Sequence, residues 1–270
     1  MRRVGPARRA AGAALGLAVL ISASARADLV PLFVIPTASK VAAVVPADHA
    51  LRIRIESRDP AKLAARLGVA PPATGTTGLD VELLPNPQPP AGDAGRTWLE
   101  PTFVIDYDEP SVQALRQEFL AQHPEPPTPE AIARFVNTKV VASSDQPWQL
   151  ASTVATRLRG DCTEHAVLAA ALARSVGLPA RVAVGLVVVA PKGQYGAFGH
   201  AWTEYRQGDR WIVADAALIG DDLQPRYLSL AWLQDEGPGY MVQFLEPLTN
   251  WARHVDVLGP GAALTEGKTP

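Results

Sequence analysis

The stretch GDCTEHAVLAAALARSVGLPARV, residues 160–182, contains the single cysteine of the 270-residue chain. Asp161 is a favourable N-cap residue, and Glu164 follows three positions later, which predicts a capping box at the start of a helix. Apolar residues continue at helical spacing as far as Gly177, which predicts the end of the helix. Cys162 is therefore predicted to lie in the first turn of a long helix.

The predicted position of Cys162 favours a reactive thiol. A helix N-terminus offers the positive end of the helix dipole and unpaired backbone N–H groups, and both stabilise a thiolate. The same N–H groups can stabilise an oxyanion that forms beside the sulfur. A buried, unreactive cysteine is the alternative, because this residue type is often buried. Such a cysteine has no reason to prefer a helix N-terminus, so we predict a nucleophile.

A buried strand and a β-hairpin are predicted after this helix. Residues 181–190 are almost continuously apolar, which is typical of a strand buried on both faces. Residues 200–206 and 211–215 flank Gly208 and Asp209, a pair that suits a two-residue turn with glycine first. The turn length then fixes which residues of the two strands face each other.

The register of this hairpin brings His200 close to Asp215. With a two-residue turn, Asp215 faces Trp202, and residues two apart share a face of the sheet. His200 and Asp215 are then diagonal neighbours, about 7–8 Å apart between backbones and within reach of a hydrogen bond. A three-residue turn would place them on opposite faces.

Three residues supply the roles that thiol catalysis requires. A thiolate nucleophile needs a base within hydrogen-bond reach, and the base needs a third group that orients it. Cys162, His200 and Asp215 can fill these roles in chain order. His165 is a competing base on the same helical surface as the thiol. We expect a structural role for His165, because no third group is placed to hold it.

The other polar and aromatic residues near these positions have simpler interpretations. A metal site would have to combine Cys162 with neighbours that lack the usual ligand spacing, namely Asp161, His165 and His200. We therefore predict no metal and no cofactor. Trp202 and Trp211 share the face of His200 and are expected to wall the site and pack in the core. Glu204 on the same face is expected to be solvated or locally paired.

Four motifs in a single order resemble the core of the transglutaminase-like superfamily. They are GDCTEHA at 160–166, GLPARV at 177–182, HAWTE at 200–204, and Trp211 followed by Asp215. The resemblance extends over about residues 110–258. It implies a papain-like α+β fold, with helices packed on an antiparallel sheet. It also implies a triad with Cys162 as nucleophile, His200 as base and then acid, and Asp215 as the orienting residue.

The resemblance also shapes the expected reaction. Bacterial members of this superfamily often resemble thiol hydrolases or proteases and need not cross-link proteins. Animal transglutaminases use a tryptophan at the oxyanion, and Trp148, 14 residues before Cys162, is not assigned that role. The oxyanion is expected to bind at the backbone near the cysteine.

The first 27 residues predict a cleavable signal peptide. They combine an arginine-rich start, an apolar run at 10–23 and a small-x-small ending at Ala27. The apolar run is shorter than the roughly 20 residues of a spanning helix, so we expect no stable membrane insertion after cleavage and a periplasmic or secreted protein. Cleavage removes five of the 25 basic residues and none of the 27 acidic ones, which leaves a formal net charge of −7.

The remaining sequence divides into three predicted regions. Residues 28–108 predict a small β-rich accessory region with a loop rich in proline and glycine, and 109–258 predict the catalytic domain. Residues 259–270 are expected to form a frayed tail. Within these regions the patterns predict strands at 51–56, 81–84, 97–107, 227–231 and 254–258, and helices at 60–67, 111–122, from 129 onward, 147–158 and 240–251.

Composition limits the classes of function. The chain is 47% apolar and 19% charged, as in soluble globular proteins. Its scattered Lys and Arg form no basic stripe, so nucleic acid is not an expected partner. One cysteine excludes an intramolecular disulfide and a four-cysteine zinc site. The sequence predicts an exported thiol acyl-transfer enzyme that acts on amide bonds of a peptide or protein through a thioester.

Hydrolysis is the favoured outcome of this predicted reaction, because no feature of the sequence marks an amine-binding site. Transamidation of protein glutamine is the first alternative, since it shares every step up to the thioester. The second alternative is a non-catalytic binding domain of the same fold, which the complete set of Cys162, His200 and Asp215 disfavours.

Overall fold

A computed structural model describes residues 32–87, 98–123, 125–144, 148–219, 223–233, 237, 239–242 and 252–264. The predicted signal peptide at 1–27 lies outside these residues. So does most of the helix predicted at 240–251, of which only 240–242 is described, in helical conformation. Among the described helices, none combines the length and the apolar character needed to cross a membrane.

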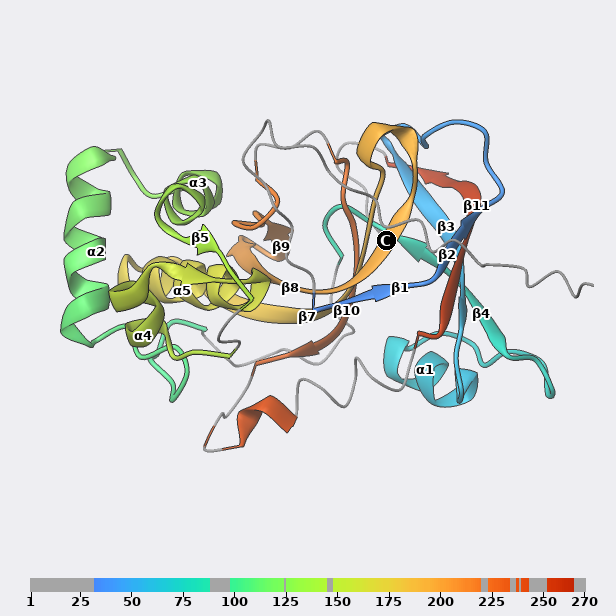
Figure 1. The fold of residues 1–270 in the computed structure, drawn as a ribbon, viewed down its shortest axis with the longest axis horizontal. Helices are drawn as coiled ribbons and strands as arrows, with labels where there is room; N and C mark the ends of the chain where they lie inside the picture. The colour runs from blue at the N-terminus through green and yellow to red at the C-terminus, as the bar shows by residue number, and fades with distance from the viewer. Residues whose placement is uncertain are drawn as a thin grey trace, which may run out of the picture.

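A five-stranded antiparallel sheet forms the centre of the molecule (Figure 1). Four strands lie in the order β1-β8-β7-β10, and β9 pairs with β8. Their bounds are Phe33–Ile35 for β1, Ala180–Val189 for β7, Gly196–Gln207 for β8, Arg210–Val213 for β9 and Arg226–Trp232 for β10. All residues of β7 are buried, as the apolar run predicts.

Helices pack on one side of this sheet, where Figure 1 shows α2 to α5 gathered. They are α2 (Pro110–Gln122), α3 (Pro129–Lys139), α4 (Ala151–Arg157) and α5 (Cys162–Ser175). Every residue of α5 except Ser175 is buried, because the helix lies between the sheet and the other helices. This arrangement confirms the predicted α+β fold class with helices on an antiparallel sheet.

The local signals at the start of α5 and at the hairpin are confirmed. The Asp161 carboxylate accepts from the backbone N–H of Thr163, and the Glu164 carboxylate accepts from the backbone N–H of Asp161, so the capping box is present. In the hairpin, Gln207 faces Arg210 across a two-residue turn. The turn uses Gly208 at φ +59°, a conformation that glycine adopts without steric penalty.

A second, four-stranded sheet lies beside the first, at the right of Figure 1. Its order is β2-β11-β3-β4, with β2 at Thr37–Ser39, β3 at His49–Glu56, β4 at Gly78–Leu83 and β11 at His254–Ala263. Helix α1 (Pro60–Leu67) begins at the predicted cap Asp59 and ends at Gly68. Two short strands, β5 (Val141–Ala142) and β6 (Arg159–Gly160), pair beside the start of α5.

Several sequence predictions differ from the observed elements. Residues 98–107 form a compact loop instead of a strand, in which the Thr102 hydroxyl accepts from the backbone N–H of Ile105 and Tyr107 bonds the carbonyl of Leu99. The helix predicted at 147–158 is shorter and begins at Ala151. Helix α2 begins at Pro110, one residue before its predicted start.

The C-terminal strand is the largest difference. The closing strand was expected at 254–258 in the catalytic sheet, followed by a frayed tail. The observed strand β11 instead pairs with β3 and β2 in the other sheet and continues to Ala263. Conversely, the early strand β1 pairs with β8. Each sheet therefore contains a strand from the opposite end of the chain, so the predicted boundary at residue 108 does not separate the sheets.

Polar contacts join the two sheets along β10. The Arg226 guanidinium donates to the backbone carbonyls of Pro46 and Ala47, just before β3, and of His49, its first residue. At the edge of the second sheet, the backbone N–H of Tyr227 donates to the Leu84 carbonyl at 2.9 Å. The accessory strands therefore pack directly against a strand of the central sheet.

Candidate active site

Cys162 is the first residue of α5 and is almost fully covered, with 1% of its surface exposed. The helix is fixed against β8 by the Thr203 hydroxyl, which donates to the Ala166 carbonyl at 2.9 Å. The His200 imidazole and the backbone of Ala201, both on β8, each lower the pKa of this thiol against the effect of burial. The fold thus brings the helix start and the hairpin strand together at the sulfur, as the sequence predicts.

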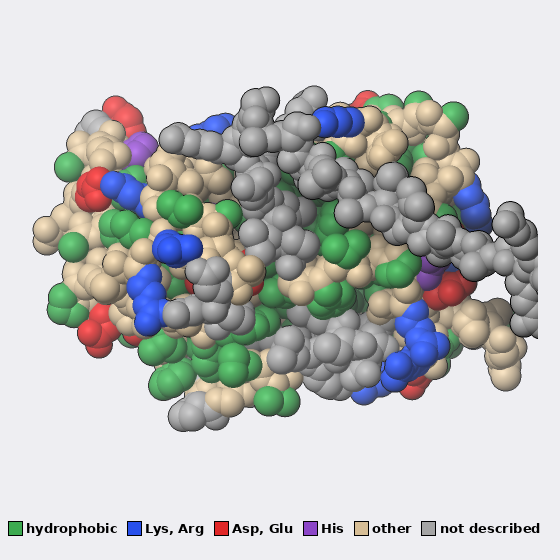
Figure 2. Space-filling view, in the orientation of Figure 1, with side chains coloured by type: hydrophobic (Ala, Val, Ile, Leu, Met, Phe, Trp, Pro, Cys, Tyr) green, Lys and Arg blue, Asp and Glu red, His purple; other side chains and the backbone are tan. Residues whose placement is uncertain are grey.

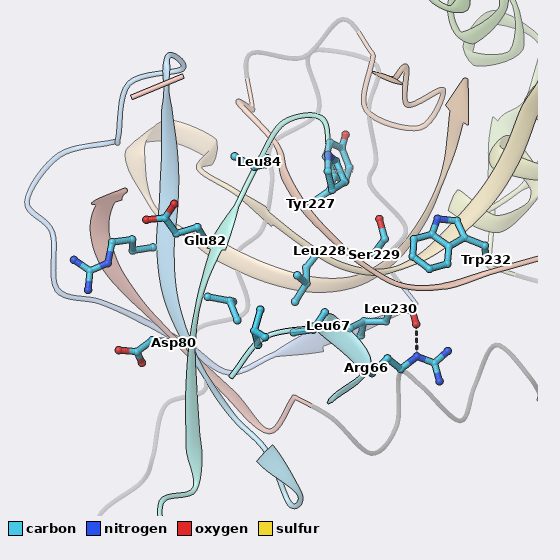
Figure 3. Close-up of a pocket in the computed structure, with 14 residues that line it drawn as sticks. Arg66, Leu67, Asp80, Glu82, Leu84, Tyr227, Leu228, Ser229, Leu230 and Trp232 are labelled. Atoms are coloured by element: carbon cyan, nitrogen blue, oxygen red, sulfur yellow. Dashed lines mark hydrogen bonds between the residues drawn. The ribbon is translucent and has the colours of Figure 1, made fainter. Parts of the chain in front are cut away.

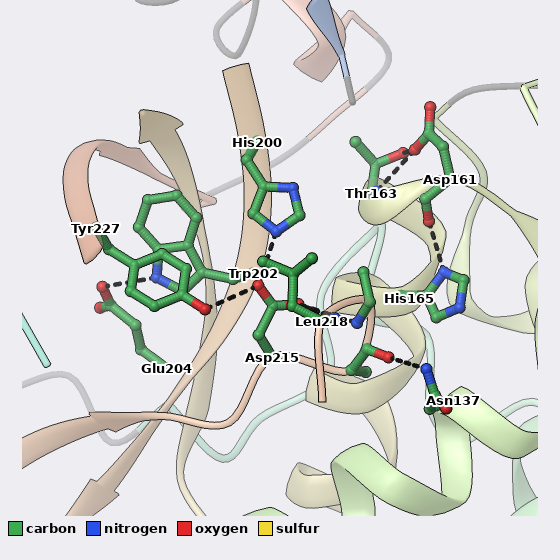
Figure 4. Close-up of polar contacts among 12 residues, drawn as sticks. Asn137, Asp161, Thr163, His165, His200, Trp202, Glu204, Asp215, Leu218 and Tyr227 are labelled. Atoms are coloured by element: carbon green, nitrogen blue, oxygen red, sulfur yellow. Dashed lines mark hydrogen bonds and ion pairs between the residues drawn. The ribbon is translucent and has the colours of Figure 1, made fainter. Parts of the chain in front are cut away.

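His200 and Asp215 form the hydrogen bond that the hairpin register predicts. His200 Nε2 lies 2.7 Å from Asp215 Oδ2, and both side chains are buried (Figure 4). Strand β9 ends at Val213, so Asp215 reaches His200 from the segment just after the strand. Because Asp215 occupies Nε2, the other ring nitrogen, Nδ1, is the atom available to the thiol. Nδ1 is buried and bonds no other group in the described part of the chain.

Asp215 is itself held by three donors. The backbone N–H groups of Ala217 and Leu218 donate to Oδ1 at 2.9 and 3.3 Å. The Tyr227 hydroxyl donates to Oδ2 at 3.1 Å, beside the bond from His200. The sequence predicts a strand at Tyr227 but not this contact, which depends on β10 lying at the edge of the central sheet.

Burial and charge act in opposite directions on the two reactive groups. Burial would lower the pKa of His200, but the charges of Asp215 and Cys162 outweigh it and raise that pKa to about 10. Burial raises the pKa of the Cys162 thiol, while the charge and hydrogen bond of His200 lower it. The sequence predicts a stabilised thiolate from the helix position alone, and the structure adds a desolvation effect that His200 must offset.

His165 occupies a structural position. Its Nδ1 bonds the carbonyl oxygen of Asp161 at 2.7 Å, one turn back along α5. Burial lowers the pKa of this imidazole, and the backbone at Val140 also contacts it. A neutral histidine with these contacts joins the start of α5 to the backbone at Val140.

Glu164 closes the first turn of α5 from the other side. Its Oε2 accepts from the backbone N–H of Asp161 and its Oε1 from that of Gln149, each at 2.9 Å. Burial, together with the nearby Asp161 charge, raises the pKa of Glu164 to about 7. The bond from Gln149 also places the residue after Trp148 against the start of the catalytic helix.

The aromatic residues of the hairpin divide between two environments. Trp202 lies against His200, with ring centroids 6.1 Å apart and ring planes 19° apart. Trp211 lies instead under the guanidinium of Arg181, which is 3.8 Å from its ring centroid. The expectation that both tryptophans line the site is therefore wrong for Trp211. The twist of the sheet carries the turn end of the hairpin, where Trp211 lies, away from His200.

Glu204 is not solvated, which corrects one of its two expected states. The side chain is fully buried and forms an ion pair with Arg181, whose Nε lies 2.7 Å from Oε2. Strands β7 and β8 pair these two residues directly opposite each other. The pairing alternative is therefore the correct one, in the core instead of at the surface.

A separate cavity of about 520 Å³ lies between β4, α1 and β10 (Figure 3). Its wall includes Tyr227, Ser229 and Trp232 of β10, and Arg66 Nε donates to the Leu230 carbonyl beside it at 2.6 Å. None of the three predicted triad residues lines this cavity. In the described ranges, no cluster of three His, Cys, Asp or Glu side chains is arranged to hold a metal ion.

Comparison with protein families identifies the domain. The family model described as the transglutaminase-like superfamily matches residues 113–216. These residues form a transglutaminase-like core. The matched range contains Cys162, His200 and Asp215, and it runs from α2 to the end of the hairpin. A search of the curated proteins finds no match to the chain.

Solved structures resemble parts of the chain. A candidate cysteine protease from Cytophaga hutchinsonii is 19% identical over 64% of this chain and 57% of its own, with a TM-score of 0.40. The periplasmic domain of TgpA from Pseudomonas aeruginosa is 24% identical over 40% of this chain and 42% of its own, with a TM-score of 0.31. A structure described as a TGase is 18% identical over 44% of this chain and 33% of its own, with a TM-score of 0.34.

The chain therefore spans less than two thirds of each of these solved structures.

The face of the molecule shown in Figure 2 has apolar, basic and acidic side chains side by side, and its Lys and Arg side chains lie in separate groups instead of one continuous stripe.

Proposed function

We propose that the chain is a thiol acyl-transfer enzyme that attacks amide bonds of a peptide or protein through Cys162. The observation that carries this proposal is the orientation of His200. Its Nε2 is bonded to Asp215 at 2.7 Å, which leaves Nδ1 for the thiol at the N-terminus of α5. A nucleophile, a base and an orienting carboxylate in this arrangement are what acyl transfer requires.

The first half of the reaction forms a thioester. His200 takes the thiol proton, and Cys162 Sγ attacks the amide carbonyl carbon while the carbonyl electrons move to the oxygen. Backbone N–H groups at the start of α5 stabilise this oxyanion, because early N–H groups of a helix have no intrahelical acceptor. The N–H of Thr163 is excluded, since the Asp161 carboxylate already accepts from it. The intermediate collapses, the C–N bond breaks, and the leaving amine takes the proton from His200.

The second half releases the acyl group. His200 removes a proton from water, the oxygen attacks the thioester carbonyl, the C–S bond breaks, and the departing thiolate takes the proton from His200. The products are a carboxylic acid and the free thiol. Asp215 keeps the imidazole oriented in both halves and stabilises its charged form, which agrees with the raised pKa of His200. We propose water as the acceptor, because no group of the site is assigned to an incoming amine.

Alkylation of Cys162 by iodoacetamide across pH tests the thiol and imidazole pair. Replacing His200 with alanine should raise the apparent pKa of alkylation, because the variant loses the charge and hydrogen bond that lower the thiol pKa. A His123→Ala variant is the matched control, since His123 lies on the helical side of the fold against Phe119. An unchanged profile in His200→Ala would contradict the proposed pair.

Incubation with casein and a dansyl-labelled primary amine separates the possible reactions. We expect cleavage of casein that is lost in Cys162→Ala, with little label incorporated. Incorporation of the amine without cleavage would establish transamidation instead of hydrolysis. A protein that shows neither cleavage nor amine incorporation, but in which His200→Ala still raises the apparent pKa of alkylation, would contradict an acyl-transfer enzyme. Such a result would favour a binding domain that has kept the residues of the site.

We also propose that the mature protein is exported, on the basis of the leader predicted at residues 1–27. Expression of the full chain with a C-terminal tag, followed by cell fractionation and N-terminal sequencing, tests this proposal. We expect a mature N-terminus near Asp28 in the periplasm or the medium. A cytoplasmic chain that still begins at Met1 would contradict it.

A further inference from the structure

A buried ion pair lies on the same face of β8 as His200. His200, Trp202 and Glu204 are two residues apart along the strand, so their side chains project to one side of the sheet. The Glu204 carboxylate accepts from Arg181 Nε at 2.7 Å. The side chains of this pair are each only 1% exposed.

The Glu204 carboxylate is the centre of a hydrogen-bond network. Its Oε2 also accepts from the indole N–H of Trp232 at 2.9 Å, and its Oε1 accepts from the hydroxyl of Ser229 at 2.8 Å. The indole N–H of Trp202 donates to Oε1 at 3.3 Å. One carboxylate thereby joins β7, β8 and β10.

Aromatic rings enclose the cationic side of the pair. The Arg181 guanidinium lies 3.8 Å from the ring centroid of Trp211, 4.7 Å from that of Trp232 and 5.6 Å from that of Trp98. Removing two charges from water is unfavourable, and apolar replacements of buried pairs are often neutral or stabilising. A gain in fold stability therefore does not explain why this pair is charged. The directional hydrogen bonds that the Glu204 carboxylate accepts give the charged pair a different role, which is to fix the positions of its neighbours.

The indole that Glu204 holds is the ring that packs on His200. The Trp202 and His200 ring planes are 19° apart with centroids at 6.1 Å, so the indole limits rotation of the imidazole. The other side of Trp202 contacts Tyr227, at 4.9 Å between centroids, and Tyr227 bonds Asp215. Figure 4 shows Trp202 and Tyr227 between Glu204 on one side and His200 and Asp215 on the other.

We propose that Glu204, paired with Arg181, is a positioning residue for His200 and acts through the indole of Trp202. The carboxylate fixes the plane of the indole, and the indole keeps the imidazole aligned so that Nε2 stays on Asp215 and Nδ1 faces Cys162. This role rests on the proposed function of His200 as the base. It gives Trp202 and Glu204, which follow His200 at two-residue intervals along β8, a role in orienting the imidazole.

Two matched substitutions test the route through Trp202. Trp202→Phe and Trp232→Phe each remove one indole N–H bond to the same carboxylate, but only Trp202 packs on His200. In the intact mature chain, NMR titration of the His200 ring should show its pKa lowered by about half a pH unit or more in Trp202→Phe, because its bond to Asp215 loosens. Trp232→Phe should leave the value unchanged. Equal shifts in both variants, or none in either, would overturn the proposal.

Glu204→Gln tests the carboxylate itself in the same titration. It keeps an acceptor oxygen but removes the charge that holds Arg181, so we expect the His200 pKa to fall in the wild-type background. In a Trp202→Phe background the same change should have little further effect, because the connecting ring is already altered. Additive effects of the two changes would contradict action through Trp202.

The tests remain decisive if one variant does not fold or if the protein shows no turnover. If Glu204→Gln does not fold, the comparison of Trp202→Phe with Trp232→Phe alone decides the proposal, because those variants retain the ion pair. The NMR readout does not require turnover. A protein that lacks amide cleavage but shows the predicted shifts would refute the proposed function and leave the positioning role of Glu204 intact.

Discussion

The hydroxyl of Tyr227 lies 3.1 Å from Oδ2 of Asp215, the same carboxylate oxygen that bonds His200. Tyr227 belongs to β10, which is at the far edge of the central sheet from β1. It therefore connects the orienting carboxylate to the strand against which the second sheet packs.

Replacing Tyr227 with phenylalanine should slow casein cleavage by roughly tenfold, since a hydrogen bond to a charged group contributes about 1.5–3 kcal/mol. The ring that packs on Trp202 remains, so the fold should persist. Tyr205→Phe is the matched control, because the Tyr205 hydroxyl is buried in the same sheet but is not among the groups that bond Asp215. Equal rates for the two variants would argue against a role for Tyr227 in holding Asp215.

Replacing Asp215 with asparagine should have a much larger effect. The Asp215 charge is the main influence that raises the pKa of His200 against burial, so the variant should show a lower imidazole pKa by NMR. Cleavage should fall by about 10³–10⁴-fold, the loss typical when the orienting acid of a triad is neutralised. A variant that keeps more than a tenth of the wild-type rate would exclude Asp215 from the proposed role.

Glu164 should make the stability of the protein depend on pH. Its pKa is about 7 in the folded chain against an ordinary value of 4.5, so the folded state binds the proton more tightly. The resulting stabilisation is complete below about pH 4.5 and is lost as the pH rises to about 7, with a total of roughly 3 kcal/mol.

Urea unfolding of wild type and Glu164→Gln at several pH values checks this expectation. The glutamine does not titrate. Its amide oxygen can accept from one of the two backbone N–H groups, of Asp161 and Gln149, but its amide nitrogen cannot accept from the other. The variant should therefore be less stable in acid, and the difference from wild type should narrow as the pH rises. Parallel curves over the whole range would show that Glu164 has an ordinary pKa.

The features that sequence predicts best are those fixed by neighbouring residues. The capping box depends on Asp161 and Glu164 three positions apart, and the hairpin register depends on the two-residue turn at Gly208. The capping box predicts the place of Cys162 at the start of α5, and the hairpin register is sufficient to predict the bond between His200 and Asp215. In each case, side chains and backbone within one short segment determine the geometry.

The features that sequence misses depend on contacts between distant segments. Tyr227 reaches Asp215 only because β10 pairs with β7, and Glu204 is buried only because Trp232 of β10 and Arg181 of β7 cover it. The strand expected at 97–107 does not form, since its bonds are made within a local loop around Thr102. Periodicity in one segment carries no information about these partners.

Gly185 lies directly opposite His200 in the pairing of β7 with β8, and we expect that it tolerates no side chain. A Cβ there would be 2.0 Å from the Leu228 carbonyl oxygen, which belongs to the backbone of β10. Gly185→Ala should therefore destabilise the fold by about 1–3 kcal/mol and reduce cleavage, because the strand that carries the base must shift. Gly237→Ala is the control, since no atom of the described residues lies within 4 Å of its Cβ position. Equal melting temperatures for the two variants would show that β10 can move away without loss.

Removal of the end of β11 should destabilise a chain whose C-terminus the sequence predicts to be frayed. Gly259, Pro260 and Ala263 pair with β3, at Arg52, Leu51 and His49. Several backbone hydrogen bonds at about 0.5–1.5 kcal/mol each are lost when the chain ends at Leu258. The free strand edge at β3 also loses its cover at this end. Urea unfolding should show a lower midpoint than that of a chain that ends at Leu264, and identical midpoints would restore the interpretation of a frayed tail.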